Sequence, residues 1–176
     1  IQDGRIGVLL LSHKIKLYCC KTMMDELEAL RPQEINVEYV EYALHRTPDK
    51  LRSELQNRID REREADTLVF VYGLCSRGLD GLVAGEKTLI IPRVHDCISL
   101  LLGSREKYDS EFGNDPGTYY LSKGWIDQKA DPYEEYLEYV DKYGEEDARW
   151  LSEQAYRHYK RVAFIDTRLP ELEQYV

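Results

Sequence analysis

The fold class is decided by residues 47–75, which read T-P-D-K-L-R-S-E-L-Q-N-R-I-D-R-E-R-E-A-D-T-L-V-F-V-Y-G-L-C. The threonine, proline and aspartate at 47–49 form a typical helix start, with an N-cap, a proline in the first turn and an early acid. Leu51, Leu55 and Ile59 then recur every fourth residue among charged neighbours, which indicates a helix lying on a core. The apolar run at 67–72 is typical of a buried strand. The stretch therefore predicts a helix that leads into a strand.

Similar patterns lie on both sides of this stretch. Further strands are predicted at residues 5–11, 35–42, 88–91 and 162–165, and helices at 15–30 and 132–159. Strands that alternate with helices of this length need crossover connections, which make neighbouring strands parallel. We therefore expect a single α/β domain over residues 1–176, with a mostly parallel, doubly wound sheet. An aromatic-rich insertion at 104–133 follows the fourth strand.

The composition limits the classes of function. The chain has 176 residues, with 24 Lys and Arg against 33 Asp and Glu, and a formal net charge of -9. A surface of this sign repels phosphate backbones, so we expect no nucleic-acid partner. The apolar runs are too short to cross a bilayer and no cationic leader is apparent, so we expect a cytoplasmic protein without a membrane role. Residues 172–176 resemble the first turn of another helix, which predicts further sequence beyond them.

Histidine and cysteine residues follow the predicted strands. The carboxyl ends of parallel strands meet at one edge of a sheet, where α/β proteins bind their ligands. Imidazole and thiolate are ligands that zinc, iron, nickel and copper take in proteins. Cys75, His95 and Cys97 would supply three ligands and leave one coordination position open, as in catalytic zinc sites. We therefore predict a metal site of these three residues, with His45 or His13 completing the shell.

Charged residues of the same loops are expected to support this site. Asp96 would orient a metal ligand, and Arg93 and Arg77 would meet an anion. The glycines after the third strand would let a phosphate approach, although their spacing matches no nucleotide-binding fingerprint. A third interpretation makes Cys75 a nucleophile whose pKa is lowered by backbone amides and Arg77. These alternatives remain open at the level of the sequence.

Two further groups of residues have competing interpretations. Cys19 and Cys20 are neighbours inside the predicted helix at 15–30, and a sulfur-rich core patch explains them better than a metal or redox site. Residues 104–133 are too long for a bare connector and are expected to form a lid over the site. The rings of the lid would suit a flat or apolar ligand, although packing in a core explains them equally well. These rings belong to Tyr119, Tyr120 and Trp125.

Several short motifs, taken in order along the chain, are similar to those of one known family. They are L-H-R-T-P at 44–48, Y-G-L-C at 72–75, I-P-R-V-H-D-C-I at 91–98, L-L-G-S at 101–104, G-T-Y-Y-L at 117–121 and G-W at 124–125. Through them the chain resembles the bacterial and archaeal family called domain of unknown function sixteen thirty-eight. Members commonly carry a cysteine just after the first strand, where this chain has Ser12 and His13, and a glycine where it has Ser76. The resemblance implies no established activity, but it suggests a link to corrinoid-dependent methyl transfer.

The sequence thus predicts a transition-metal-binding protein that holds zinc or iron. We expect a metal-dependent enzyme or accessory protein that handles a thiol or a methyl group, with a corrinoid as the further cofactor that the resemblance suggests. The alternative is a non-catalytic carrier or binding module for a metal-containing or phosphate-bearing cofactor, which a broad aromatic-lined cleft would favour. Both have a small-molecule ligand, whereas a structural subunit would show a large apolar patch for a protein partner. The sequence does not decide whether the protein is an enzyme.

Overall fold

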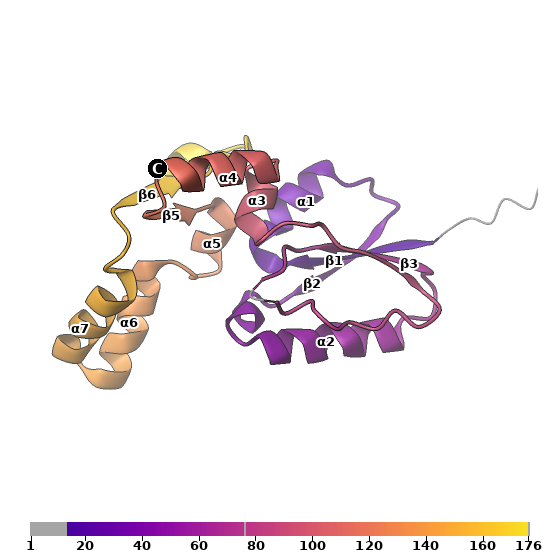
Figure 1. Cartoon of the computed structure of the whole chain (residues 1–176), viewed down its shortest axis with the longest axis horizontal. Coiled ribbons are helices and arrows are strands. Elements are labelled where there is room, and N and C mark those ends of the chain that lie inside the picture. Colours follow the sequence, from indigo (N-terminus) through magenta and orange to yellow (C-terminus); the bar gives the residue numbers. More distant parts are fainter. Residues whose placement is uncertain (1–13, 76, 176) are drawn as a thin grey trace, which may run out of the picture.

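The computed structural model describes residues 14–75 and 77–175, and its centre is a parallel sheet of four strands (Figure 1). The strands lie in the order β2-β1-β3-β4, and every neighbouring pair is parallel. Their bounds are Ile15–Cys20 for β1, Asn36–Val40 for β2, Thr67–Val71 for β3 and Thr88–Ile90 for β4. The predicted parallel α/β architecture is confirmed. The strand predicted at 5–11 and His13 lie outside the described residues.

The central strand β1 corrects one prediction. Residues 15–30 were expected to form one helix, but Ile15–Cys20 is a strand, and the helix α1 covers only Met24–Leu30. β1 lies between β2 and β3, so its residues from Leu17 onward are buried on both faces. A strand buried on both faces carries a continuous apolar run, and periodicity does not separate such a run from a buried helix.

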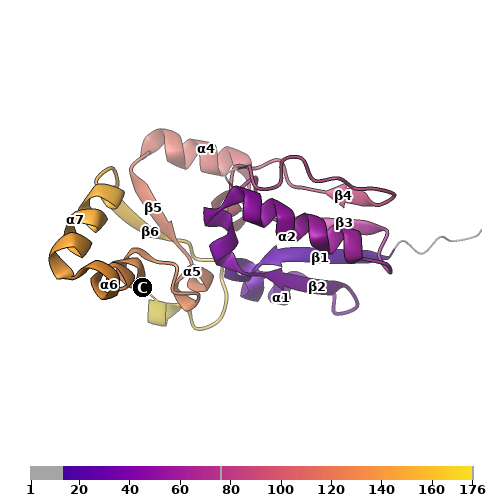
Figure 2. The ribbon, with the colours of Figure 1, turned by 90° about the horizontal axis from the view of Figure 1, so that it is seen from below.

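Helices cover both faces of this sheet. α2 (Pro48–Arg61) lies along one face, whereas α1 and the short α3 (Cys97–Leu101) lie on the other (Figures 1 and 2). Leu51, Leu55 and Ile59 of α2 are fully buried against the sheet, as their spacing predicts. Burial of this apolar stripe fixes the position of α2, because each buried Leu or Ile side chain contributes about 1.5–3 kcal/mol. The short 3-10 helices are Lys21–Met23, Tyr42–Arg46 and Leu172–Tyr175.

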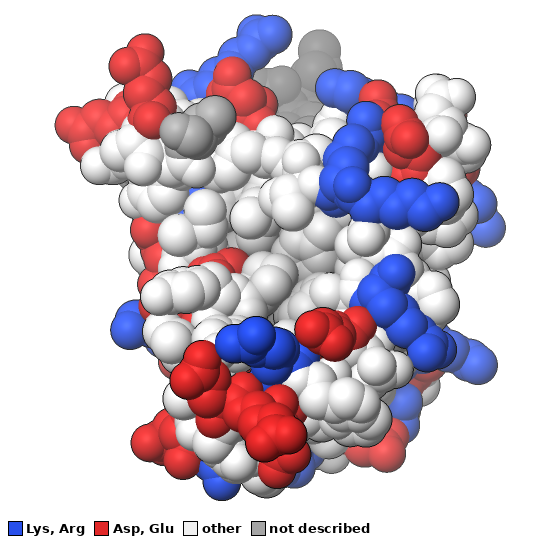
Figure 3. All heavy atoms as spheres, turned by 90° about the vertical axis from the view of Figure 1, so that its left-hand side faces the viewer, with Lys and Arg blue, Asp and Glu red and all other residues white. Residues whose placement is uncertain are grey.

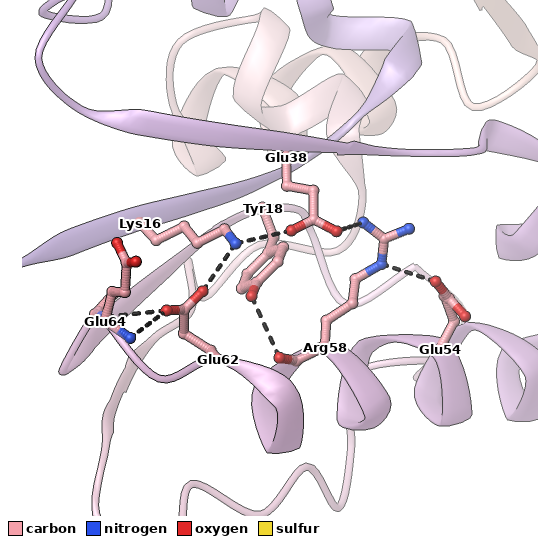
Figure 4. Close-up of polar contacts among 8 residues, drawn as sticks. Lys16, Tyr18, Glu38, Glu54, Arg58, Glu62 and Glu64 are labelled. Carbon is pink, nitrogen blue, oxygen red and sulfur yellow. Dashed lines mark hydrogen bonds and ion pairs between the residues drawn. The ribbon is translucent and has the colours of Figure 1, made fainter.

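A network of ion pairs stabilises the sheet toward the amino ends of its strands (Figure 4). The Lys16 amine contacts Glu62 at 2.8 Å and Glu38 at 2.9 Å. Arg58 of α2 joins the network by pairing with Glu38 and, at 2.8 Å, with Glu54. Burial opposes a charge on Glu62, but hydrogen bonds from Lys16 and from two backbone N–H groups lower its pKa to about 2. The network therefore ties α2 to β1 and β2.

The region after residue 103 forms a second, smaller layer beside the sheet. The segment expected as a lid, 104–133, contains α4 (Arg105–Asn114), β5 (Thr118–Leu121) and α5 (Lys123–Asp127). β5 pairs in parallel with β6 (Arg161–Phe164), which confirms the last predicted strand. Whether this segment moves as a lid stays a prediction.

The helical region predicted at 132–159 is a hairpin of two helices. It consists of α6 (Pro132–Tyr143) and α7 (Glu145–Tyr156), which pack on each other at one end of the molecule (Figure 1). Gly144 separates them with a φ of +84°, a left-handed conformation that glycine adopts without strain. Among the described residues, no helix is long and apolar enough to cross a membrane.

Candidate functional site

Three cysteines from separate segments lie close together at the carboxyl edge of the four-stranded sheet. Cys20 is the last residue of β1, Cys75 follows β3, and Cys97 is the first residue of α3. Cys20 and Cys97 are buried and Cys75 is half-buried, and all of them are free thiols. The charge of Cys20 acts on both Cys75 and Cys97, and the charge of Cys75 acts on Cys97. We call these residues the thiol cluster.

The close approach of two loops brings Cys75 and Cys97 together. A Cβ atom added to Gly73 would lie only 2.3 Å from the Cα of Asp96, so only glycine allows the backbones to come this close. The Cys75 N–H donates to the carbonyl oxygen of His95 at 3.1 Å, and the Leu74 N–H donates to that of Val94 at 3.0 Å. Gly73 therefore positions the loop that carries Cys75 against the start of α3.

Cys75 has an unusual backbone conformation. Its φ is +43°, in the left-handed region that residues with a side chain seldom adopt. Holding a non-glycine residue there costs about 1–3 kcal/mol, and such residues are concentrated at functional sites. The strain at Cys75 marks it as the member of the cluster whose side chain position is most specifically held.

The surroundings keep these thiols protonated. Burial, followed by the charges of Cys20 and Asp96, raises the pKa of the Cys75 thiol to about 12, although two backbone N–H groups favour its thiolate. Burial and the other two thiols raise the pKa of Cys97 well above its ordinary value. The shift of Cys75 is opposite to the one that the nucleophile interpretation requires. A free thiolate nucleophile at Cys75 is therefore disfavoured, because thiol reactivity follows the thiolate.

Beside the thiol cluster are two buried polar groups without a hydrogen-bond partner in the described part of the chain. The Tyr72 hydroxyl lies next to Cys20, and the Trp125 indole N–H lies next to Cys97. Each favours the thiolate of its neighbour, yet neither makes a hydrogen bond of ordinary geometry among the described residues. Buried polar groups are seldom left in this state. The Tyr72 hydroxyl and the Trp125 indole N–H could therefore donate hydrogen bonds to thiolates of the cluster.

α5 brings Trp125 to this position. A Cβ atom on Gly124 would lie 1.9 Å from the carbonyl oxygen of Thr22, so α5 lies directly against the turn that follows β1. The hydroxyl of Ser122 accepts from the backbone N–H of Trp125 at 3.4 Å and caps the helix. The contact of α5 with the turn after β1 therefore closes one side of the thiol cluster.

The predicted histidine ligands take different positions. The His95 side chain is exposed, and its ring lies 5.9 Å from the ring of Tyr108, away from the contacts described for the thiols. His45 is half-buried, with its ring 5.7 Å from that of Trp125. Burial lowers the pKa of His45, and its Nδ1 hydrogen-bonds the carbonyl oxygen of Tyr42. Held in this way, a neutral His45 presents its Nε2 as a free lone pair, as metal-binding histidines do.

The charged residues expected to assist the site do not lie together. Asp96 caps α3 by accepting from the Ser99 N–H at 3.2 Å and also raises the pKa of Cys75. Arg77 is exposed and pairs with Asp80 at 2.7 Å, so it does not face the thiols. Arg93 is exposed beside His95 and lines a separate hollow of about 300 Å³.

The expected lid residues line a cleft next to Asp96. Tyr119, Tyr120 and Trp125 share this cleft with the rings of α4, and its volume is about 360 Å³. Tyr120 and Trp125 also pack against the main core, so the core and ligand interpretations both describe part of their role.

Cys20 is the residue that sequence reasoning missed. The helix predicted at 15–30 placed it in a core patch, whereas it is the last residue of β1. Successive side chains of a strand point to opposite faces, so Cys19 and Cys20 have different surroundings. Burial, then the charge of Cys20 and those of Glu26 and Glu28 of α1, raise the pKa of Cys19. The Cys20 sulfur accepts a hydrogen bond from the Thr22 hydroxyl at 3.2 Å and lies beside Tyr72. No local signal identifies Cys20, because a strand buried on both faces lacks the alternation of apolar and polar residues.

Among the described residues, no three His, Cys, Asp or Glu side chains are already arranged as ligands of one ion. Comparisons with known proteins add a family and no activity. No curated protein and no solved structure matches the chain. The profile of the family described as Protein of unknown function (DUF1638) matches residues 39–176, a span that contains Cys75, Cys97 and the aromatic cleft. The chain therefore belongs to this family.

Proposed function

We propose that this protein binds a thiophilic transition metal, zinc or ferrous iron, through the thiolates of Cys20, Cys75 and Cys97. The observation that carries the proposal is the meeting of three thiols from separate segments, in surroundings where burial and their mutual charges oppose ionisation. A divalent cation removes this opposition, because it stabilises the thiolate forms of its ligands. The thiols would close on the ion by rotating about their side-chain bonds.

The position of the cluster in the fold supports this proposal. The strand order β2-β1-β3-β4, with helices on both faces, is consistent with the doubly wound sheet and the aromatic-rich insertion that the sequence predicts. In such sheets, ligands bind beyond the carboxyl ends of the strands where the strand order reverses. Here the reversal lies between β1 and β3, whose ends carry Cys20 and Cys75.

Three thiolates leave one position of a tetrahedral ion for another ligand. Two occupants of that position correspond to the two functions that the sequence predicts. A substrate thiol bound there would lose its proton and become a nucleophile, and its sulfur would take a methyl group as the bond from methyl to its donor breaks. A methylated corrinoid is the donor that the family resemblance suggests. In the alternative function, the Nε2 of His45 fills the position and the protein is a non-catalytic carrier.

Metal analysis of matched cysteine variants tests the proposal. Protein purified without oxygen is expected to contain about one zinc or iron ion per chain, and Cys97→Ser should lower the affinity at least roughly tenfold. Cys19→Ser is the matched control, because Cys19 is equally buried in β1 but has the carboxylates of α1 as neighbours. Equal metal content in wild type and Cys97→Ser, or none in either, would contradict the proposal.

Cobalt substitution separates the two functions. Sulfur-to-cobalt charge-transfer absorption should fall by about one third when Cys75 is replaced by serine, since one of three thiolates is lost. Addition of a small thiol should restore the intensity if one position is open to substrate. In a carrier closed by His45, added thiol leaves the spectrum unchanged until His45→Ala opens the position.

A further inference from the structure

The aromatic cleft beside Asp96 is a second feature of this region, distinct from the thiol cluster. Its lining comes from the start of α3, from α4, from β5 and α5, and from Tyr159, which lies between α7 and β6. Its volume of about 360 Å³ lies within the range of sites for small organic ligands. These segments are far apart in the sequence, so the cleft exists only in the folded chain.

Flat aromatic surfaces form much of this lining. The rings of Tyr108 and Phe112 are stacked, with centroids 6.2 Å apart and an angle of 11° between their planes. Tyr119 lies edge-on to Tyr159, with centroids 5.0 Å apart. Phe112 is 53% exposed and Tyr159 is 44% exposed, although aromatic rings of this size are usually more buried. A flat ligand would cover these rings and stack on them.

Polar groups in the cleft select the edge of such a ligand. The Tyr120 hydroxyl and the Trp125 indole N–H are both buried and lack a partner among the described residues. Asp96 uses Oδ1 to cap α3, and its carboxylate, which also faces the Tyr108 hydroxyl, is a hydrogen-bond acceptor in the lining of the cleft. The Asp96 carboxylate accepts from a donor on the ligand, and the Tyr120 hydroxyl can donate to an acceptor on the ligand.

The charge of Asp96 also argues against a phosphate close to the ring. Uncharged side chains cover the middle of the face at the end of the molecule where α6 and α7 lie, and charged groups surround it (Figure 3). The net charge of -9 also disfavours an anionic ligand. An uncharged or cationic ring suits the cleft better than an anionic one.

We propose that the cleft binds a planar heteroaromatic ring that carries an amino or N–H donor for Asp96 and stacks on Tyr108. The ring nitrogens or carbonyl groups of the ligand accept from the Tyr120 hydroxyl. This assignment goes beyond metal binding and does not depend on it, because none of the three thiols lines the cleft.

A fluorescent nucleoside tests this ligand class. The probe is 2-aminopurine riboside, whose emission is quenched when its base stacks on an aromatic ring, and the protein is treated with a chelator so that failure would not bear on the metal site. We expect saturable quenching by the protein, and purine riboside, which lacks the amino donor, should compete at least about fivefold more weakly.

Matched variants locate the binding site. Tyr108→Leu removes a stacking ring. Asp96→Asn keeps one oxygen to cap α3 but replaces the other by an NH2 donor, which cannot accept from the ligand, so each variant should weaken binding by roughly tenfold or more. Tyr143→Leu is the control, because this ring is exposed at the end of α6 and outside the cleft. Thermal unfolding of each variant checks the fold, and Tyr120→Phe replaces any variant that does not fold. Absence of saturable quenching at about 1 mM protein, or equal affinity in Tyr108→Leu and Tyr143→Leu, would overturn the proposal.

Discussion

Replacement of Gly73 by alanine tests the contact on which the thiol cluster depends. The new Cβ atom would lie 2.3 Å from the Cα of Asp96, so the two loops must separate by roughly 1 Å to restore an ordinary contact. Overpacking of this kind costs about 1–3 kcal/mol of unfolding free energy. The expected fall in the thermal midpoint is about 2–12 °C for a chain of this length. The same movement strains the hydrogen bond from the Cys75 N–H to His95, so Cys75 moves away from Cys97.

Two measurements separate this effect from general destabilisation. Thermal unfolding followed by circular dichroism gives the stability, and competition with a chromophoric chelator gives the zinc affinity, which should fall about 10–100-fold in Gly73→Ala. Gly113→Ala in α4 is the matched control, because an added Cβ atom there meets nothing within 4 Å. It should raise stability by up to about 1 kcal/mol and leave zinc affinity unchanged. A Gly73→Ala protein with the stability and zinc affinity of the wild type would show that the loops do not meet as described.

Two further predictions concern the sheet and its helix. The pKa of Glu62 is lowered to about 2 from 4.5, so its stabilising effect is present above about pH 4.5 and is lost as the pH falls toward 2. With allowance for solvent screening, Glu62→Gln should lower the unfolding free energy by about 2 kcal/mol at pH 7, and urea titrations should show this difference shrinking below pH 4.5. A difference independent of pH would refute the role assigned to the pair with Lys16. Leu55→Ala should cost about 2–5 kcal/mol, because the Leu55 side chain is fully buried, whereas Leu30→Ala, at an 82% exposed position, should change stability by less than about 0.5 kcal/mol in the same titration.

Local patterns predict the parts of the fold in which each element carries its own signal. α2 begins at Pro48 with Thr47 as the N-cap residue, and its fourth-residue stripe is the face that is buried. The strands β2, β3 and β4 are β-branched or apolar runs bounded by turns or loops. β1 fails as a prediction because it is short and buried on both faces, which removes the alternation that identifies a strand. The pairing of β5 with β6 joins residues about forty positions apart, and no local pattern encodes such a partner.

The candidate site was predictable to the extent that it follows strand ends. Cys75 and Cys97 lie where parallel topology places them, and their proximity follows from the order of β3 and β4 in the sheet. Cys20 was missed because its strand was interpreted as a helix. The direction of the His95 side chain was not predictable, since it depends on the ring of Tyr108 in a helix that follows later in the chain. Which loop residues face a site is decided by packing between distant segments, and strand order alone does not specify it.

The two edges of the four-stranded sheet differ in how their polar groups are satisfied. Toward the amino ends of the strands, Lys16 pairs with both Glu38 and Glu62, and this network contributes to stability. At the carboxyl edge, Cys75 is held in a left-handed conformation, and the Tyr72 hydroxyl is buried without a partner. Strain and unpaired donors reduce stability, and natural sequences retain them chiefly where function requires them. Because both edges belong to the same sheet, the stability contributed by the amino edge and the core offsets the stability lost at the carboxyl edge. This asymmetry supports the proposal that the protein functions at the thiol cluster.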